Sequence, residues 1–183
     1  MKNGIVNARG NNGKTALMRT AEKGDVETVK ILLKTGADVN ARDNNGMTAL
    51  MWVDKSPETA KVLLKYGADV KARDNGGSTA LMYATMYSHT ETAELLLKHG
   101  ANVNTKDNSG WTALECAAMK GYTETAELLL KHGANVNAKN NYGWTALMYA
   151  TMYGHTATTE LLLKHGAEDR CLYGEAELYV QIR

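Results

Sequence analysis

Several residue types that would indicate a specialised chain are scarce. The 183 residues include no phenylalanine, one proline and two cysteines. So little proline excludes a collagen-like chain or a proline-rich linker. The two cysteines, Cys116 and Cys171, are too few for a disulfide framework, which favours a reducing compartment. No apolar run approaches the roughly 20 residues of a membrane span, and residues 1–7 lack the apolar stretch of a signal peptide. We therefore expect a soluble, cytoplasmic protein with no membrane partner.

An excess of charge of one sign is also absent. Lysine and arginine total 21 and aspartate and glutamate total 20, so the formal net charge is +1. A dominant basic surface is therefore excluded, and we expect no nucleic-acid partner. An acidic disordered tail is excluded for the same reason.

Instead, the sequence contains internal repeats. The tripeptide Thr-Ala-Leu begins at Thr15, Thr48, Thr79, Thr112 and Thr145. A second marker, Gly-Ala followed by Asp, Asn or Glu, begins at Gly36, Gly67, Gly100, Gly133 and Gly166. Both markers recur every 33 residues, except for one interval of 31 that both of them share. Two independent markers with the same rhythm indicate a repeat architecture.

Each unit has the signals of two short helices and a turn. Thr112 is a suitable N-cap for a first helix that runs to Gly121. A second helix begins near Thr123, and basic residues followed by Gly133 form its stop signal. The polar, asparagine-rich segment 135–142 predicts a turn or short hairpin that leads to the next unit. One such helix pair cannot close a core by itself, so the copies must stack into a solenoid.

The second unit is two residues shorter than the others, and the deletion lies between Trp52 and Ser56. Ser56 as N-cap and Pro57 at the first helical position indicate a new helix start. We therefore expect a shortened first helix in this unit, followed by a re-initiated second helix and a local change in curvature.

The repeat resembles the ankyrin repeat over residues 5–167. The resemblance rests on the sequence Gly-Ala-Asp/Asn-Val-Asn at 36–40, 100–104 and 133–137, and on the Asp-x-x-Gly-x-Thr lead-in at 43–48, 74–79 and 107–112. This chain has Thr-Ala-Leu-Met where the family usually has Thr-Pro-Leu-His. Methionine loses the hydrogen bonds of that histidine, so we expect a weaker tie between hairpins.

The resemblance implies an all-α ankyrin-repeat solenoid of stacked helix-turn-helix units with hairpin or turn fingers. We expect one domain, 1–183, with a partial N-terminal finger at 1–12 and a degenerate C-terminal cap at 168–183. The expected repeats are 13–45, 46–76, 77–109, 110–142 and 143–167. Gly174–Leu178 occupies the Gly-x-Thr-Ala-Leu slots, and Leu172, Leu178, Tyr179, Val180 and Ile182 are the residues expected to cover the last repeat.

Three patterns imitate reactive sites. Residues 8–15 satisfy a loose phosphate-loop pattern that ends in Lys14 and Thr15, but they lie in a fingertip where the lysine slot varies between units. His99, His132 and His165 recur every 33 residues, and stacked helices about 8–10 Å apart cannot share one zinc ion. Cys116 has no histidine within its own unit's helices. We therefore expect no enzyme, no catalytic residues, no cofactor and no metal.

Positions that vary between units predict a binding surface, because the repeating positions build the stack. In the ankyrin family these variable slots line the concave face. The candidate partner-binding residues are Met47, Arg73, Ser78, Met86, Tyr87, Lys106, Trp111, Met119, Lys120, Lys139, Tyr142, Trp144, Met152 and Tyr153. Exposed Trp, Tyr and Met bordered by Lys are typical of interface anchors. We expect a protein or peptide partner on the concave face of repeats 3–5.

Two alternatives stay open at this point. The Trp rings can instead lie on neighbouring fingers and stiffen them. The whole chain can also be a structural spacer within a larger multidomain protein, with no partner surface of its own. We expect a monomer, with end-to-end self-association through the incomplete ends as the alternative.

Overall fold

A computed structural model describes residues 3–53 and 55–168. These residues form helices and turns, with one isolated antiparallel β-bridge between Arg73 and Thr79. The helices are α1 (Asn3–Val6), α2 (Ala16–Glu22), α3 (Val26–Lys34), α4 (Pro57–Lys65), α5 (Ala80–Met86), α6 (Thr90–Lys98), α7 (Ala113–Lys120), α8 (Thr123–Lys131), α9 (Ala146–Met152) and α10 (Thr156–Lys164).

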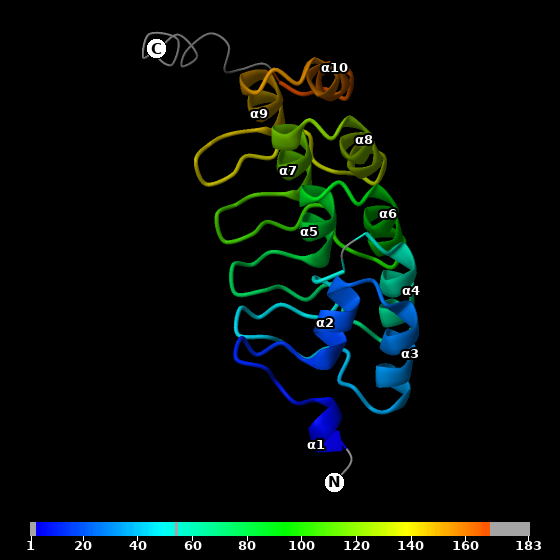
Figure 1. Ribbon diagram of the computed structural model, residues 1–183. Helices are drawn as coiled ribbons and strands as arrows, with labels where there is room; N and C mark the ends of the chain where they lie inside the picture. Colours follow the sequence, from blue (N-terminus) through cyan, green and yellow to red (C-terminus); the bar gives the residue numbers. More distant parts are fainter. Residues whose placement is uncertain (1–2, 54, 169–183) are drawn as a thin grey trace.

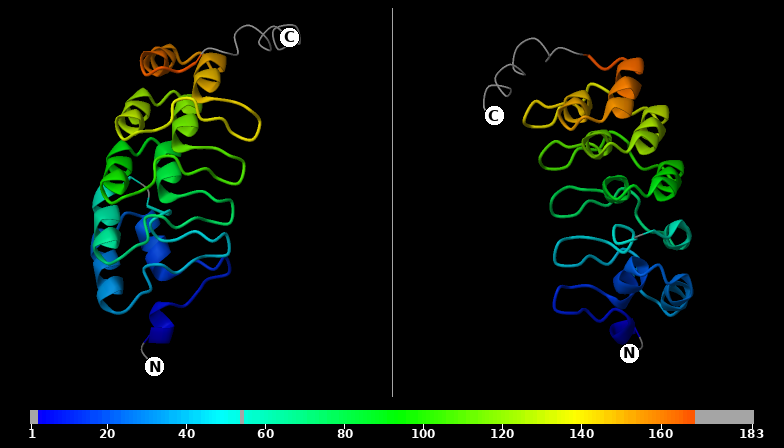
Figure 2. Two further views of the ribbon diagram at one scale, coloured as in Figure 1. Left: turned by 180° about the vertical axis from the view of Figure 1, so that it is seen from behind. Right: turned by 45° about the horizontal axis from the view of Figure 1, so that its top comes forward.

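The helices stack in two rows, from α2 and α3 near the N-terminal end to α9 and α10 at the other end (Figure 1). The inner row contains α2, α5, α7 and α9, and the outer row contains α3, α4, α6, α8 and α10. The fingers, which are the loops that lead from an outer helix to the next unit, project to one side (Figures 1 and 2). The inner row and the fingers together form the inner face. Units one to five are numbered by their outer helices. This arrangement confirms the all-α ankyrin-type solenoid.

Helix ends follow the local signals in the sequence. The side chain of Thr112 accepts a hydrogen bond from the amide of Glu115, and Gly121 ends α7 in the left-handed region with φ 70°. α8 spans Thr123–Lys131, and Gly133 follows its C-cap with φ 83°. The predicted starts and stops of both helices are therefore confirmed. Leucines of both rows meet in the core, where Leu114 of α7 and Leu129 of α8 are fully buried.

The second unit departs furthest from the others. Residues 48–53 form hydrogen-bonded turns in place of an inner helix, with the amide of Trp52 donating to the carbonyl of Thr48. The side chain of Ser56 then accepts from the amide of Thr59, and Pro57 begins α4. The shortened first helix and the new helix start are confirmed, and the shortening goes as far as the loss of the helix. The change in curvature stays a prediction.

Neighbouring fingers are held together by side-chain amides. Asn75 donates through Nδ2 to the carbonyl of Asn44, Asn108 donates to Asn75, and Asn141 donates to Asn108, at 3.0–3.1 Å. This close stacking explains the glycine at 110, where a Cβ would lie 2.5 Å from Oδ1 of Asn141. Asparagine amides thus join the fingers directly, although Thr-Ala-Leu-Met replaces the usual family motif.

At the N-terminal end the short helix α1 precedes the first finger. The expected cap at 168–183, with Gly174–Leu178 and its apolar neighbours, lies outside the described residues apart from Glu168. Within the described ranges, no helix is long and apolar enough to cross a membrane.

Candidate functional site

The largest exposed apolar side chains of the inner face belong to the third to fifth units. Tyr87 is 62% exposed, Tyr142 is 72%, Met152 is 59% and Tyr153 is 53%. Tyr87 and Tyr153 are the C-cap residues of α5 and α9, so they occupy equivalent positions two units apart. Tyr142 lies in the finger before α9. These four residues are called the exposed cluster below.

Other predicted residues are less accessible. Met86, Met119, Trp111 and Trp144 are half-buried, as is Ser78. Met47 is 8% exposed and packs in the hydrophobic core. The expectation that Met47 lies on the surface was therefore wrong. In the short unit it lies beside the turns at 48–53, where the core has no inner helix and the methionine side chain occupies part of that space.

The two tryptophans pack on one tyrosine. The ring of Trp111 stacks on Tyr149 of α9 with centroids 4.6 Å apart, and the ring of Trp144 lies 5.1 Å from the same tyrosine. The Tyr149 hydroxyl accepts a 2.9 Å hydrogen bond from Nδ2 of Asn140. Each tryptophan therefore has a structural contact. They are half-buried rather than freely exposed.

Tyr149 belongs to a recurring tie between inner row and finger. Tyr83 donates from its hydroxyl to Asp74 at 2.6 Å, and Trp52 donates from Nε1 to Asp43 at 3.0 Å. Burial, followed by the bond to Asp74, raises the pKa of Tyr83. The sequence signal for this tie is a polar finger residue nine positions before an aromatic residue, and the comparison of equivalent slots did not reveal it. These ties hold the finger bases against the inner row.

A row of cations follows the fingers. Arg73 donates through Nη2 to the carbonyl of Lys106 at 2.7 Å, and Lys106 donates through Nζ to the carbonyl of Lys139 at 2.7 Å. Arg9 and Arg42 make the equivalent bonds to the next finger. Ser78 donates its amide to Asp74. Several predicted surface cations thus also connect neighbouring units. Lys120, at the end of α7, is exposed.

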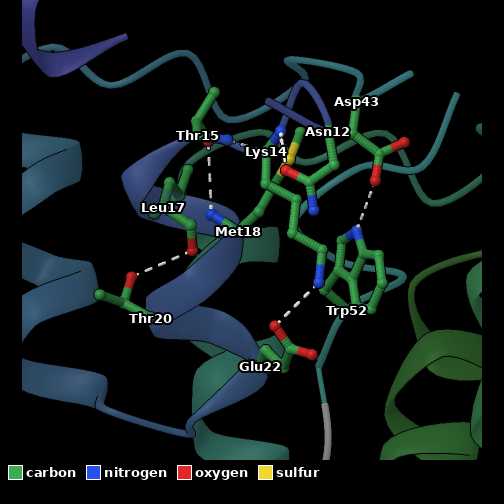
Figure 3. A network of polar contacts seen from close by, with 9 residues as sticks. All are labelled: Asn12, Lys14, Thr15, Leu17, Met18, Thr20, Glu22, Asp43 and Trp52. Atoms are coloured by element: carbon green, nitrogen blue, oxygen red, sulfur yellow. Dashed lines mark hydrogen bonds and ion pairs between the residues drawn. The ribbon is translucent and has the colours of Figure 1, made fainter. Parts of the chain in front are cut away.

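Lys14, the lysine of the phosphate-loop lookalike, is engaged by side chains of the first two units (Figure 3). Its Nζ lies 2.9 Å from Oε2 of Glu22 and 3.0 Å from the ring centroid of Trp52. The helix that follows, α2, has only seven residues. The ammonium is therefore held by a carboxylate and an indole.

The periodic histidines and Cys116 have structural surroundings. His99, His132 and His165 each place Nδ1 2.8–2.9 Å from the carbonyl oxygen four residues earlier, where the imidazole N–H can donate to the end of its helix. No group of three or more potential metal ligands occurs among the residues described. Burial raises the pKa of the Cys116 thiol to about 12, so the thiolate that a nucleophile requires is suppressed at neutral pH.

Comparison with protein families gives one match. Residues 2–74, 54–140 and 108–173 match the model described as ankyrin repeats (3 copies). Together these overlapping segments cover most of the chain. A search of curated proteins gave no match.

Proposed function

Because the chain belongs to the ankyrin-repeat family, whose repeats are in general protein-interaction modules and typically not enzymes, we propose that it is a non-catalytic scaffold. It binds a protein or peptide partner on the inner face of its third to fifth units. The observation that carries this proposal is the exposed cluster, which leaves three tyrosines and a methionine open to solvent along one end of the inner face.

The exposed cluster has the composition of interface anchors. Tyrosine supplies a large contact area together with a hydroxyl, and methionine adapts its shape to a partner. The half-buried Met86, Met119, Trp111 and Trp144 extend this apolar surface. Because Trp111 and Trp144 pack on Tyr149, their rings are already positioned before a partner arrives. A surface ordered in advance loses less entropy on binding.

Charged residues set orientation in this proposal. Lys120, Lys106 and Lys139 are exposed around the apolar surface. They favour a partner with carboxylates next to its apolar side chains, and they make association faster at low salt. The net charge of +1 gives no support to a nucleic-acid partner.

The test replaces two anchors by the residue that the chain itself uses at the same position. Lys23 is the C-cap of α2, equivalent to Tyr87 and Tyr153. The double variant Tyr87→Lys/Tyr153→Lys therefore keeps a residue type that the repeat accepts. Peptides selected from a random display library against the intact chain provide the binding probe, and affinity is measured by calorimetry. We expect the double variant to lose about 100-fold, equivalent to ~2.7 kcal/mol, with an unchanged helical circular dichroism signal.

The matched control is Tyr66→His. Tyr66 is 40% exposed at the end of α4 in the outer row, where other units have histidine. This variant removes an exposed aromatic residue from the opposite row, and we expect it to bind like wild type. Failure to select any peptide supports the spacer alternative, and equal affinity of the double variant refutes the proposed face.

A further inference from the structure

A second asparagine ladder joins the loops at the bases of the fingers. Asn104 donates through Nδ2 to the carbonyl of Gly133 and accepts through Oδ1 from the amide of Asn135, at 3.0 and 2.8 Å. Asn40 makes the same pair of bonds to Gly67 and Asp69. Asn7 and Asn137 make it as well. Each rung thus satisfies one main-chain N–H and one C=O of the next unit.

One rung is missing because Lys71 occupies the asparagine slot of its unit. The repeat places the carbonyl of Gly100 and the amide of Asn102 opposite this slot. In the described residues no side chain bridges these two groups. An open pocket of about 520 Å³ lies at this position, and its lining includes Val70, Lys71, Arg73, Asn102 and Lys106.

The charge of the pocket is one-sided. Its lining contains three cations, Lys71, Arg73 and Lys106, and no carboxylate. Asn102 occupies the slot that holds Asp38 and Asp69 in the first two units, so a repeated acid is neutral here. The nearest acid along the chain, Asp69, directs Oδ1 to the amide of Lys71. A negative ligand therefore meets three cations and a main-chain N–H.

We propose that this pocket binds a small oxyanion, either a phosphate or a carboxylate group. The ligand accepts from the Asn102 amide in place of the missing asparagine oxygen. Lys71 supplies the charge that an asparagine rung would not. Arg73 and Lys106 already donate to finger carbonyls, so their charges are held in place at the wall of the pocket. The proposal does not depend on the partner surface of the inner row.

The test uses ¹⁵N-labelled full-length chain and follows amide chemical shifts at constant ionic strength. Inorganic phosphate, acetate and acetamide are titrated in separate arms. Acetamide is nearly the same size as acetate but carries no charge, so it separates recognition of an anion from filling of the vacant rung. We expect a saturable shift of the Asn102 amide with phosphate, with acetate, or with both, and none with acetamide.

The variants separate the pocket from general attraction to a basic surface. Lys71→Asn restores the rung found in neighbouring units and removes one cation, so binding should weaken by at least tenfold. Lys65→Asn removes the same charge from the exposed end of α4 and should bind like wild type. Lys71→Ala leaves the rung vacant and should also bind more weakly than wild type, which guards against an effect of refilling alone.

The proposal is overturned if neither phosphate nor acetate gives a saturable shift. It is equally overturned if acetamide binds as well as acetate, or if Lys71→Asn and Lys65→Asn weaken binding to the same extent. The identity of the anion that saturates the Asn102 shift distinguishes a phosphate ligand from a carboxylate ligand.

Discussion

Ser88 is a residue whose side chain conflicts with its backbone position. It has φ 59°, and it is the only residue other than glycine with positive φ among those described. Equivalent turns use Gly24, Gly121 and Gly154, with φ between 68° and 72°. The left-handed region costs an ordinary residue roughly 1–2 kcal/mol.

We therefore expect Ser88→Gly to raise the free energy of unfolding by about 0.5–1 kcal/mol, since greater unfolded-state entropy of glycine offsets part of the relief. Chemical denaturation measures it. Gly154→Ser is the reciprocal control, because a Cβ there meets nothing within 4 Å, and it should destabilise the chain. A loss of stability in Ser88→Gly would contradict this account.

Glu115 is a buried carboxyl at a position where Met18 and Met148 stand in other units. Its Oε2 accepts from the amide and hydroxyl of Thr112, whereas Met18 and Met148 accept the equivalent amide through sulfur. Burial raises the pKa of Glu115, and the bonds to Thr112 only partly oppose this. The folded protein therefore holds this proton more tightly than the unfolded chain does.

Because the folded pKa lies above the ordinary value, the contribution of Glu115 to stability is greatest at pH values below the unfolded pKa, near 4.5. It is lost as pH rises through the folded pKa. We expect Glu115→Met to gain stability relative to wild type over that rise. Denaturation of both proteins across the pH range measures the difference. A difference that stays constant with pH would contradict the assignment.

At the scale of elements, the sequence predicted what depends on nearby residues. Thr112, Gly121 and Gly133 act within one turn of their own helices, so the bounds of α7 and α8 followed from them. Ser56 and Pro57 likewise placed the start of α4. The loss of the whole inner helix at 48–53 was not predicted, because its Thr-Ala-Leu start is identical to those of its neighbours.

The candidate site was harder to predict because its contacts join different units. Trp111 stacks on Tyr149, but the slot of Tyr149 holds Cys116 in the unit that contains Trp111. Comparison of equivalent positions within units therefore gave no sign of this pair. Met47 occupies the same slot as Trp111 and Trp144, yet it is buried because its own unit lacks the inner helix. Slot comparison thus found variable positions without their exposure.

At the scale of the whole molecule, stability passes from one unit to the next, so a weak junction divides the solenoid. The inner row is continuous through α5, α7 and α9, whereas residues 48–53 leave α2 without a helical neighbour in that row. The missing rung at Lys71 affects the next junction. Two adjacent defects separate the first two units from the last three.

We therefore expect amides of α2 and α3 to exchange at a lower free energy than those of α7 and α8 in native-state hydrogen exchange. Lys71→Asn should narrow this difference by about 1 kcal/mol, since each restored hydrogen bond contributes about 0.5–1.5 kcal/mol. Lys65→Asn should leave it unchanged, because it alters charge without adding a bond between units. Identical free energies across all units of the wild type would show that the chain opens as one cooperative body, and the two defects would then have no mechanical consequence.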